Sequence, residues 1–307
     1  MIVAKCPLRV SLAGGSTDLQ DFIDQNGYGA VVSFPSTLYA YISLHENNRG
    51  KYIIDYTKRE EVRNPVDIKN NVAREVLREY PMPPVTITFN TDAHSSGSGL
   101  ASSSAFLIAL IKAITTFKGI KISNFEICKQ ALQIERRFNP LTGHQDPYGC
   151  GLSSLKTMKF HKNKDPTITY LEQKLFDRFN MFLLYTGIKK NSTSVLKKTI
   201  KTDRRELLQV VETMSDTILK KDLHNFIKSV KIGWEHKKRT SPHVLEDPDL
   251  QALDKILEQH KDVLAHRLCG AGNRGYFLVF TDKSVHSTPH PGIKIDICQD
   301  GTTAIRI

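Results

Sequence analysis

In the first half of the chain, apolar positions recur with two different periods. Apolar residues two apart are typical of strands with one buried face, and apolar residues three or four apart are typical of helices. Residues 105–117 are apolar almost all round, which predicts a helix that is buried on most of its faces. In this half the patterns predict strands over residues 8–13, 30–34, 37–45, 51–56 and 84–90, and helices over 70–80, 105–117 and 123–138.

The second half mixes strands with three amphipathic helices in no regular βαβ order. This arrangement predicts an α+β fold, and a chain of 307 residues is long enough for two domains. We expect one domain over residues 1–172 and a second over residues 173–307. The predicted strands cover 155–161, 167–172, 181–187, 266–270, 275–281, 293–297 and 302–307, and the predicted helices cover 204–221, 223–238 and 248–260.

The formal net charge of +11 favours anionic partners such as nucleotides, sugar phosphates or nucleic acid. Aromatic residues do not interleave with the basic runs, which argues against nucleic acid. The five cysteines are far apart and form no CxxC pair, which argues against a disulfide framework and a zinc site and fits a reducing compartment. Because no apolar stretch is long enough to span a bilayer, we expect a cytoplasmic protein without a membrane partner.

The stretch HSSGSGLASSSAF at residues 94–106 lies between a predicted strand and the buried helix. Its serines therefore occupy the first turn of that helix, where free backbone N–H groups and the helix dipole favour an anion. Gly97 and Gly99 allow close approach of the backbone to a ligand, and Ser102 and Ser103 offer hydroxyl groups. The loop lacks a G-K-[ST] ending, so a bound phosphate needs a metal or cations from elsewhere. A purely structural Ser-rich turn is the alternative.

Glu135 lies in an apolar stripe of the helix predicted over residues 123–138, together with Leu132 and Cys128. A carboxylate directed into apolar surroundings is costly unless a cation or several donors meet it. Mg²⁺ suits a Glu, a Ser hydroxyl and nucleotide phosphates together. An ion pair with Arg136 or Arg137 is the alternative.

Asp146 lies in the polar segment TGHQDPYGCG, between Gly143 and Gly149. Pro147 biases Asp146 to an extended conformation. Such an aspartate could orient, or accept a proton from, a hydroxyl group that attacks a phosphoryl group. A simple Asp-Pro turn is the alternative.

Three stretches together resemble the GHMP kinase superfamily: PLRVSLAGGSTD, SSGSGLASSSA and CGAGNRGYF. The segments AGGSTD, ERRFNPLTGHQDPYG, LLYTGIKKNST and GWEHKKRTSP are most similar to the sugar kinases of the D-glycero-D-manno-heptose 7-phosphate kinase group. The resemblance implies ATP- and Mg²⁺-dependent phosphorylation of an anomeric hydroxyl, here to a heptose 1,7-bisphosphate for surface polysaccharides. It also implies an N-terminal domain like domain 2 of ribosomal protein S5 and a ferredoxin-like C-terminal domain.

The resemblance further implies a role for individual residues. Asp146 is the catalytic aspartate, Arg9 lies beside it or the transferring phosphoryl group, and Ser103 and Glu135 hold magnesium. ATP is bound by Gly97, Ser98, Gly99, Leu100, Ala101, Ser102 and Ser103, and the sugar by Asp18, Thr17, Gly143, Thr186 and Gly187.

Two departures from the family pattern concern its glycines. Ala101 stands where a Gly is common, which is acceptable at negative φ. Asn273 and Arg274 interrupt the C-terminal glycine run; Asn tolerates positive φ better than Arg does, so either Arg274 adds a phosphate contact or the loop is remodelled. This departure motivates a second hypothesis, a nucleotide- or sugar-binding relative without catalytic activity.

The sequence leaves the acceptor open among a heptose phosphate, L-fucose and galactose. The basic charge fits a phosphorylated sugar, and Lys190, Lys237 and Arg239 are candidates for a distal phosphate. A homodimer is also left open.

Overall fold

Two β-sheets organise the chain in the computed structural model, which describes residues 1–94, 97–187 and 203–307. The larger sheet contains β1 (Ile2–Ala13), β2 (Tyr28–Glu46), β3 (Tyr52–Asp55), β4 (Arg59–Val62), β5 (Val85–Thr91), β6 (Lys156–His161), β7 (Lys164–Tyr170) and β12 (Thr303–Arg306). Its order is β12-β1-β2-β5-β3-β4, with β6 paired to β2 and β7 paired to β6. The smaller sheet has the order β11-β8-β10-β9 and contains β8 (Phe179–Tyr185), β9 (Val263–Leu268), β10 (Tyr276–Asp282) and β11 (Gly292–Ile295).

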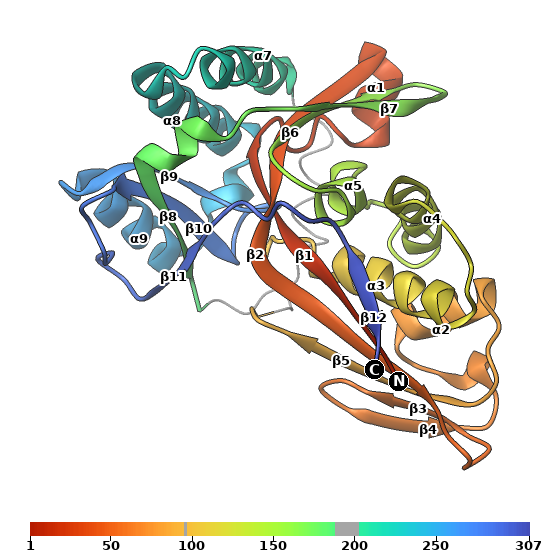
Figure 1. Cartoon of the computed structure of the whole chain (residues 1–307). Helices are drawn as coiled ribbons and strands as arrows, with labels where there is room; N and C mark the ends of the chain where they lie inside the picture. The colour runs from red at the N-terminus through yellow and green to blue at the C-terminus, as the bar shows by residue number, and fades with distance from the viewer. Residues whose placement is uncertain (95–96, 188–202) are drawn as a thin grey trace.

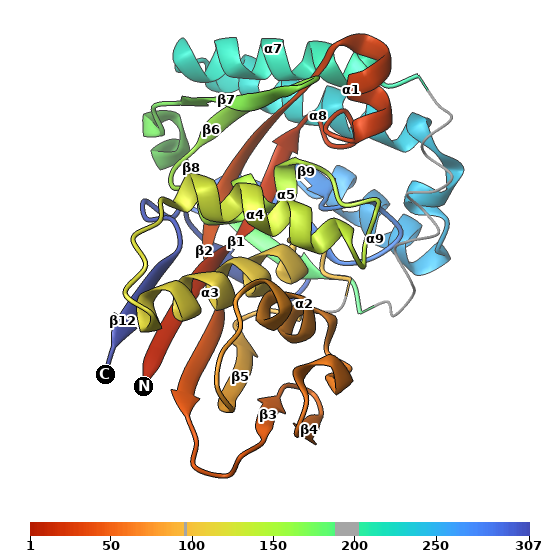
Figure 2. The same cartoon turned by 90° about the vertical axis from the view of Figure 1, so that its right-hand side faces the viewer.

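Helices cover both sheets, so the predicted α+β class is confirmed. The helices are α1 (Gln20–Asn26), α2 (Asn71–Glu79), α3 (Ser102–Phe117), α4 (Asn124–Arg136), α5 (Gln145–Gly151), α7 (Arg205–Leu219), α8 (Leu223–Thr240) and α9 (Pro248–Gln259), with 3-10 turns at Pro65–Asp67, Lys174–Arg178 and Pro242–Leu245. Helix α3 packs on β1 and β2 and is itself covered by α2, α4 and α5 (Figure 1, Figure 2). This position explains why α3 is apolar on nearly all sides.

The two sheets are joined by the α7–α8 pair. Helix α7 packs against α8 and also against β1 and β2 of the larger sheet, while α8 packs against β9 of the smaller sheet. Helix α9 also lies against β9 (Figure 1). Side chains from α8 and β9 can therefore reach the region where β1 ends, although they are more than 200 positions away in the sequence.

The last strand returns to the first. Strand β12 pairs antiparallel with β1, and the two termini lie side by side (Figure 1). The backbone N–H of Ile307 donates to the carbonyl oxygen of Met1 at 2.9 Å. Residues 303–306 thus belong to the larger sheet, although we expected them in the second domain. The expected domain boundary between residues 172 and 173 stays a prediction.

Several elements differ from the sequence-based expectation. Strand β2 runs unbroken through Pro35, where we expected two strands; shifts in the β1–β2 register on either side of Arg9 accompany this passage. Strand β4 was not expected, because its sequence REEV is polar and lies at the sheet edge. Helix α1 is too short for its period to stand out. Within the described ranges, no helix has the length and apolarity needed to cross a bilayer.

Candidate active site

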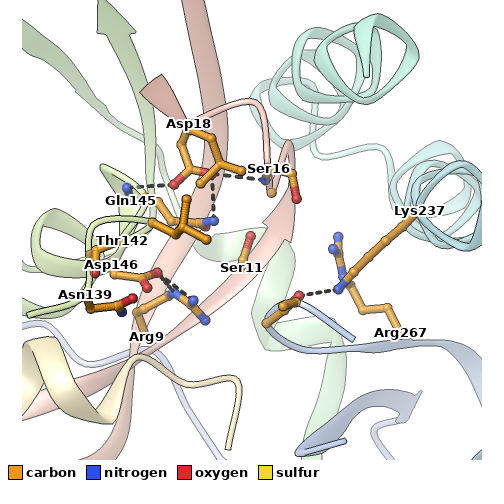
Figure 3. A pocket seen from close by; sticks show the side chains of 16 residues that line it. Arg9, Ser11, Ser16, Asp18, Asn139, Thr142, Gln145, Asp146, Lys237 and Arg267 are labelled. Atoms are coloured by element: carbon orange, nitrogen blue, oxygen red, sulfur yellow. Dashed lines mark hydrogen bonds and ion pairs between the residues drawn. The ribbon is translucent and has the colours of Figure 1, made fainter. Parts of the chain in front are cut away.

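Two cavities share one wall. The loop cavity is lined by residues 97–99 and 101–104, Glu135 and the loop of residues 270–272 with Arg274. The Asp18 cavity is lined by side chains from the end of β1 and the following loop, from residues 139–146, and by Lys237 and Arg267 (Figure 3). The residues common to both cavities are Arg9, Asn139, Asp146, Gly270 and Ala271.

Arg9 and Asp146 form an ion pair in the shared wall. Oδ1 of Asp146 accepts bonds from Nε of Arg9 at 3.1 Å and from Nη2 at 2.6 Å. The third nitrogen, Nη1, donates to the carbonyl oxygen of Gly99, which ties the ion pair to the glycine-rich loop. Arg9 is buried, whereas the Asp146 side chain is 26% exposed. Among the described residues Oδ2 of Asp146 has no hydrogen-bond partner, so it is free for a ligand.

Asp146 is helical, and the expected extended conformation is wrong. It lies in the first turn of α5, with Pro147 directly after it. A proline is tolerated there because the first N–H groups of a helix have no intrahelical acceptor. The helix brings Gly149 against β1, where an added Cβ would lie 3.1 Å from Cβ of Arg9. Helix α5 therefore aims the Asp146 carboxylate at Arg9.

Asp18 is held against the start of α5. Its Oδ1 accepts from the Ser16 N–H and from Nε2 of Gln145, and its Oδ2 accepts from the Gln145 N–H, each at 3.0 Å. Burial, followed by the charge of Asp146, raises the pKa of Asp18 to about 6. A Cβ on Gly143 would lie 2.1 Å from Oδ2 of Asp18, so only glycine permits this approach. The structure thus brings together Asp18 and Gly143, as the sequence suggested.

The two glycine-rich loops are in backbone contact. A Cβ on Gly99 would lie 2.6 Å from the carbonyl oxygen of Cys269, and one on Gly270 would lie 2.4 Å from Cα of Gly99. Of the two residues that interrupt the glycine run, Asn273 takes the positive φ, at 60°. Arg274 does not, and its guanidinium lies over Gly97, where a Cβ would be 2.0 Å from Cζ. The loop accommodates both residues, with Arg274 at the wall of the loop cavity.

In the 97–103 loop, Ala101 does not meet the condition of a negative φ, and Leu100 does not line the cavity. Ala101, the residue before α3, has φ of 59° and not a negative value. Leu100 does not reach the cavity: its side chain is fully buried, its N–H donates to Oγ of Ser98, and its carbonyl accepts from the Arg9 N–H. The remaining predicted residues of the loop do line the cavity, with Ser103 exposed on it and Ser102 bonded to Oγ of Ser98.

Glu135 is 2% exposed and has no ion pair among the described residues. Arg136 and Arg137, the alternative partners, instead contact Thr142 and Glu79. Burial raises the pKa of Glu135 to about 7, and a hydrogen bond donated by the Ser104 hydroxyl offsets part of this rise. A buried carboxylate without a cation fits a metal site. The described part of the chain has no cluster of three or more His, Cys, Asp or Glu for a metal, so Mg²⁺ here requires phosphate oxygens as further ligands.

Thr17 is not placed to contact a ligand in either cavity. It is fully buried, and its hydroxyl interacts with the carbonyl oxygens of Gly14 and Ala30 and accepts from the Ala30 N–H. Thr186 and Gly187 are not among the described residues that line either cavity; the Thr186 N–H donates to the carbonyl oxygen of Gly275.

The three candidates for a distal phosphate are separated by the structure. Lys190 lies outside the described residues, Arg239 is exposed and lines neither cavity, and Lys237 lines the Asp18 cavity. Arg267 and Ser104 also line these cavities and were not expected from the sequence. Arg267 lies on a strand of apolar residues, so its position in the sequence gave no signal of a cavity.

Residues 67–154 match the GHMP kinases N terminal domain. The chain is 26% identical to a D-glycero-alpha-D-manno-heptose 7-phosphate kinase of Campylobacter jejuni, over 92% of this chain and 89% of that protein. It is 25% identical to an L-fucokinase/L-fucose-1-P guanylyltransferase of Bacteroides fragilis, over 59% of this chain and 20% of that protein. The crystal structure of a D-glycero-D-manno-heptose 1-phosphate kinase from Bacteroides thetaiotaomicron has the same fold, with a TM-score of 0.79 at 21% identity, covering 100% of this chain and 99% of that one.

Proposed function

We propose that the chain, which carries a GHMP kinase N-terminal domain and has the fold of solved kinases, is a phosphotransferase that phosphorylates the anomeric hydroxyl of D-glycero-D-manno-heptose 7-phosphate with ATP. A phosphotransferase needs a donor space and an acceptor space that meet at one catalytic group. The observation that carries the proposal is that Asp146 and Arg9 line both cavities.

The loop cavity suits the phosphates of ATP. The first turn of α3 presents free N–H groups and the positive end of the helix dipole. The loop itself contains no lysine, and Arg9 and Arg274 supply the positive charge from other segments. Glu135 and Ser103 are the residues that would hold Mg²⁺, which supplies further neutralisation of phosphate charge when bound.

The Asp18 cavity suits the sugar. We place the attacking hydroxyl at Oδ2 of Asp146, which orients it and accepts its proton as the oxygen forms a bond to the γ-phosphorus. The bond from that phosphorus to the bridging oxygen breaks, and ADP leaves. Arg9 holds the carboxylate in place, because its Nε and Nη2 groups both donate to Oδ1. Asp18 accepts a hydrogen bond from another sugar hydroxyl.

Similarity to two kinases named for heptose phosphates supports this acceptor. L-Fucose and galactose are the alternative acceptors, since the chain is also similar to an L-fucokinase and, at 24% identity over 82% of its length, to a galactokinase of Thermotoga maritima. The alternative of an inactive relative rested on the altered glycine run, which the loop accommodates through Asn273.

The test is ADP release by the purified protein with MgATP and one acceptor at a time: heptose 7-phosphate, L-fucose, galactose and mevalonate. We expect turnover with heptose 7-phosphate at a kcat/KM at least tenfold above that with the other acceptors. Turnover with mevalonate alone would overturn the sugar kinase assignment, and the absence of turnover with all four would favour the inactive relative.

A further inference from the structure

Two buried cations face the Arg9–Asp146 pair across the Asp18 cavity. Lys237 comes from α8 and Arg267 from β9, and they are 7% and 3% exposed. Figure 3 shows them on the opposite side of the pocket from Arg9 and Asp146. Neither forms an ion pair with any described carboxylate.

The carboxylates of this cavity are already engaged. Asp146 pairs with Arg9, and Asp18 accepts its three bonds from Ser16 and Gln145. The two stretches that the structure does not describe, residues 95–96 and 188–202, contain no Asp or Glu in their sequence. The chain therefore offers no carboxylate of its own to neutralise Lys237 and Arg267.

Both cations have unused donors. Nε and Nη1 of Arg267 are buried and have no hydrogen-bond partner among the described residues. Nζ of Lys237 donates to the carbonyl oxygens of Leu268 at 2.8 Å and Gly270 at 2.6 Å, which leaves one of its three protons for a ligand. Burial lowers the pKa of both side chains, and the charge of Arg267 lowers that of Lys237 further. An anion bound in the cavity would offset the cost of burying these two charges.

We propose that Arg267, with Lys237 beside it, binds the phosphate group that the acceptor sugar already carries. The proposal rests on the proposed function and specifies which residues select the phosphorylated sugar. Arg267 lines the Asp18 cavity and is not among the residues of the loop cavity, so its ligand is on the acceptor and not on the nucleotide. A planar guanidinium whose N–H groups have no acceptor within the described chain fits the oxygens of a phosphate.

Specificity follows from the cost of leaving these cations unpaired. A sugar that lacks the distal phosphate binds without neutralising them, and a site built for a polar group rejects a ligand that lacks that group. We therefore expect the enzyme to discriminate strongly between heptose 7-phosphate and the same heptose without phosphate.

The first experiment compares KM for these two sugars in wild type, Arg267→Met and Arg239→Met. Arg239 is a matched control, because it is an arginine that lines neither cavity. We expect Arg267→Met to raise KM for heptose 7-phosphate by about 10- to 100-fold, which is typical of losing hydrogen bonds between charged groups, while KM for the unphosphorylated heptose changes less than about threefold. Equal changes in both KM values, or no change in either, would overturn the proposal.

The second experiment does not depend on turnover. Binding of inorganic phosphate is measured by calorimetry with the loop cavity filled by Mg²⁺ and a non-hydrolysable ATP analogue. We expect wild type and Arg239→Met to bind phosphate and Arg267→Met to bind it at least tenfold more weakly. If no sugar is phosphorylated but this difference is found, the proposed function fails and the phosphate site stands. If wild type binds no phosphate, or Arg267→Met binds it equally, the site is wrong. Thermal unfolding checks the fold; we expect no loss of stability, since the variant removes an unpaired buried charge.

Discussion

Arg9 donates two hydrogen bonds to the same oxygen of Asp146, from Nε at 3.1 Å and from Nη2 at 2.6 Å. The pair lies where the loop cavity meets the Asp18 cavity, and Nη1 of Arg9 also holds the carbonyl oxygen of Gly99. One guanidinium thus fixes the aspartate relative to the glycine-rich loop, while Oδ2 of Asp146 has no hydrogen-bond partner among the described residues.

Asp146→Asn should reduce kcat by about 10²- to 10⁴-fold, the usual contribution of a positioned general base. The amide is nearly isosteric but cannot take the hydroxyl proton. We expect the dissociation constant of ATP, measured by calorimetry, to change less than about threefold, because the loop and α3 are untouched. Asp165→Asn is the control, as Asp165 is exposed on β7. Wild-type turnover by Asp146→Asn would remove Asp146 from the catalytic role.

Gly99 and Ala101 should respond to substitution in opposite directions. Both have positive φ, 73° and 59°. Gly99→Ala adds a Cβ that would lie 2.6 Å from the Cys269 carbonyl oxygen, so we expect the free energy of unfolding to fall by at least about 2 kcal/mol. Ala101→Gly relieves a strained residue, so we expect a gain of up to about 1 kcal/mol. Urea unfolding of both variants measures this; a loss of stability in Ala101→Gly would show that Ala101 is unstrained.

The affinity for the sugar should fall in acid as Asp18 takes up a proton. The pKa of Asp18 is raised to about 6, chiefly by burial, so its carboxylate is lost as pH drops below 6. We expect KM for the sugar to rise by up to about tenfold per pH unit below 6, with KM for ATP constant. The steady-state KM values at saturating MgATP, from pH 8 to pH 5, measure this.

The contribution of Asp18 to the stability of the fold depends on pH in the opposite direction to its contribution to sugar affinity. A carboxyl whose folded pKa lies above its unfolded value contributes stability below the unfolded pKa of about 3.9, and this contribution is lost as pH rises through 6. Acid therefore favours the folded state through this group.

The control for the KM prediction is Asp18→Asn, which should show a KM for the sugar that does not change with pH. A pH profile like that of wild type would assign the titration to another group.

Lys156→Met should destabilise the helix that carries Asp146. Nζ of this fully buried lysine lies 3.0 to 3.4 Å from the carbonyl oxygens of Gly149, Leu152, Ser153 and Ser154, at the C-terminal end of α5. Without the lysine amine these carbonyls, two of them buried and two partly buried, lose their donor, and we expect the free energy of unfolding to fall by about 3 kcal/mol.

The matched control for this change is Lys159→Met, an exposed lysine on the same strand. Urea unfolding should show a change below about 0.5 kcal/mol for the control. Equal stability of Lys156→Met and wild type would mean that the four carbonyls find other donors.

Local patterns in the sequence determined much of the fold. The period of two predicted the main strands, and the all-round apolar pattern of residues 105–117 predicted a helix buried on most of its faces, as α3 is. The helical phase of Glu135 predicted its burial, and the resemblance in three motifs singled out Arg9, Asp18 and Asp146, which the structure places around one cavity. These properties follow from neighbours within a few positions or from a motif that is itself continuous.

Tertiary structure decided what depends on contacts between distant segments. Ala101 takes a positive φ, and Arg274 lies over Gly97, because two loops about 170 positions apart pack backbone to backbone. Arg267 and Lys237 became a candidate phosphate site only when β9 and α8 placed them opposite Asp146 without an acidic partner. No local pattern encodes such a placement, since the free energy of a buried charge depends on which groups the whole fold brings near it.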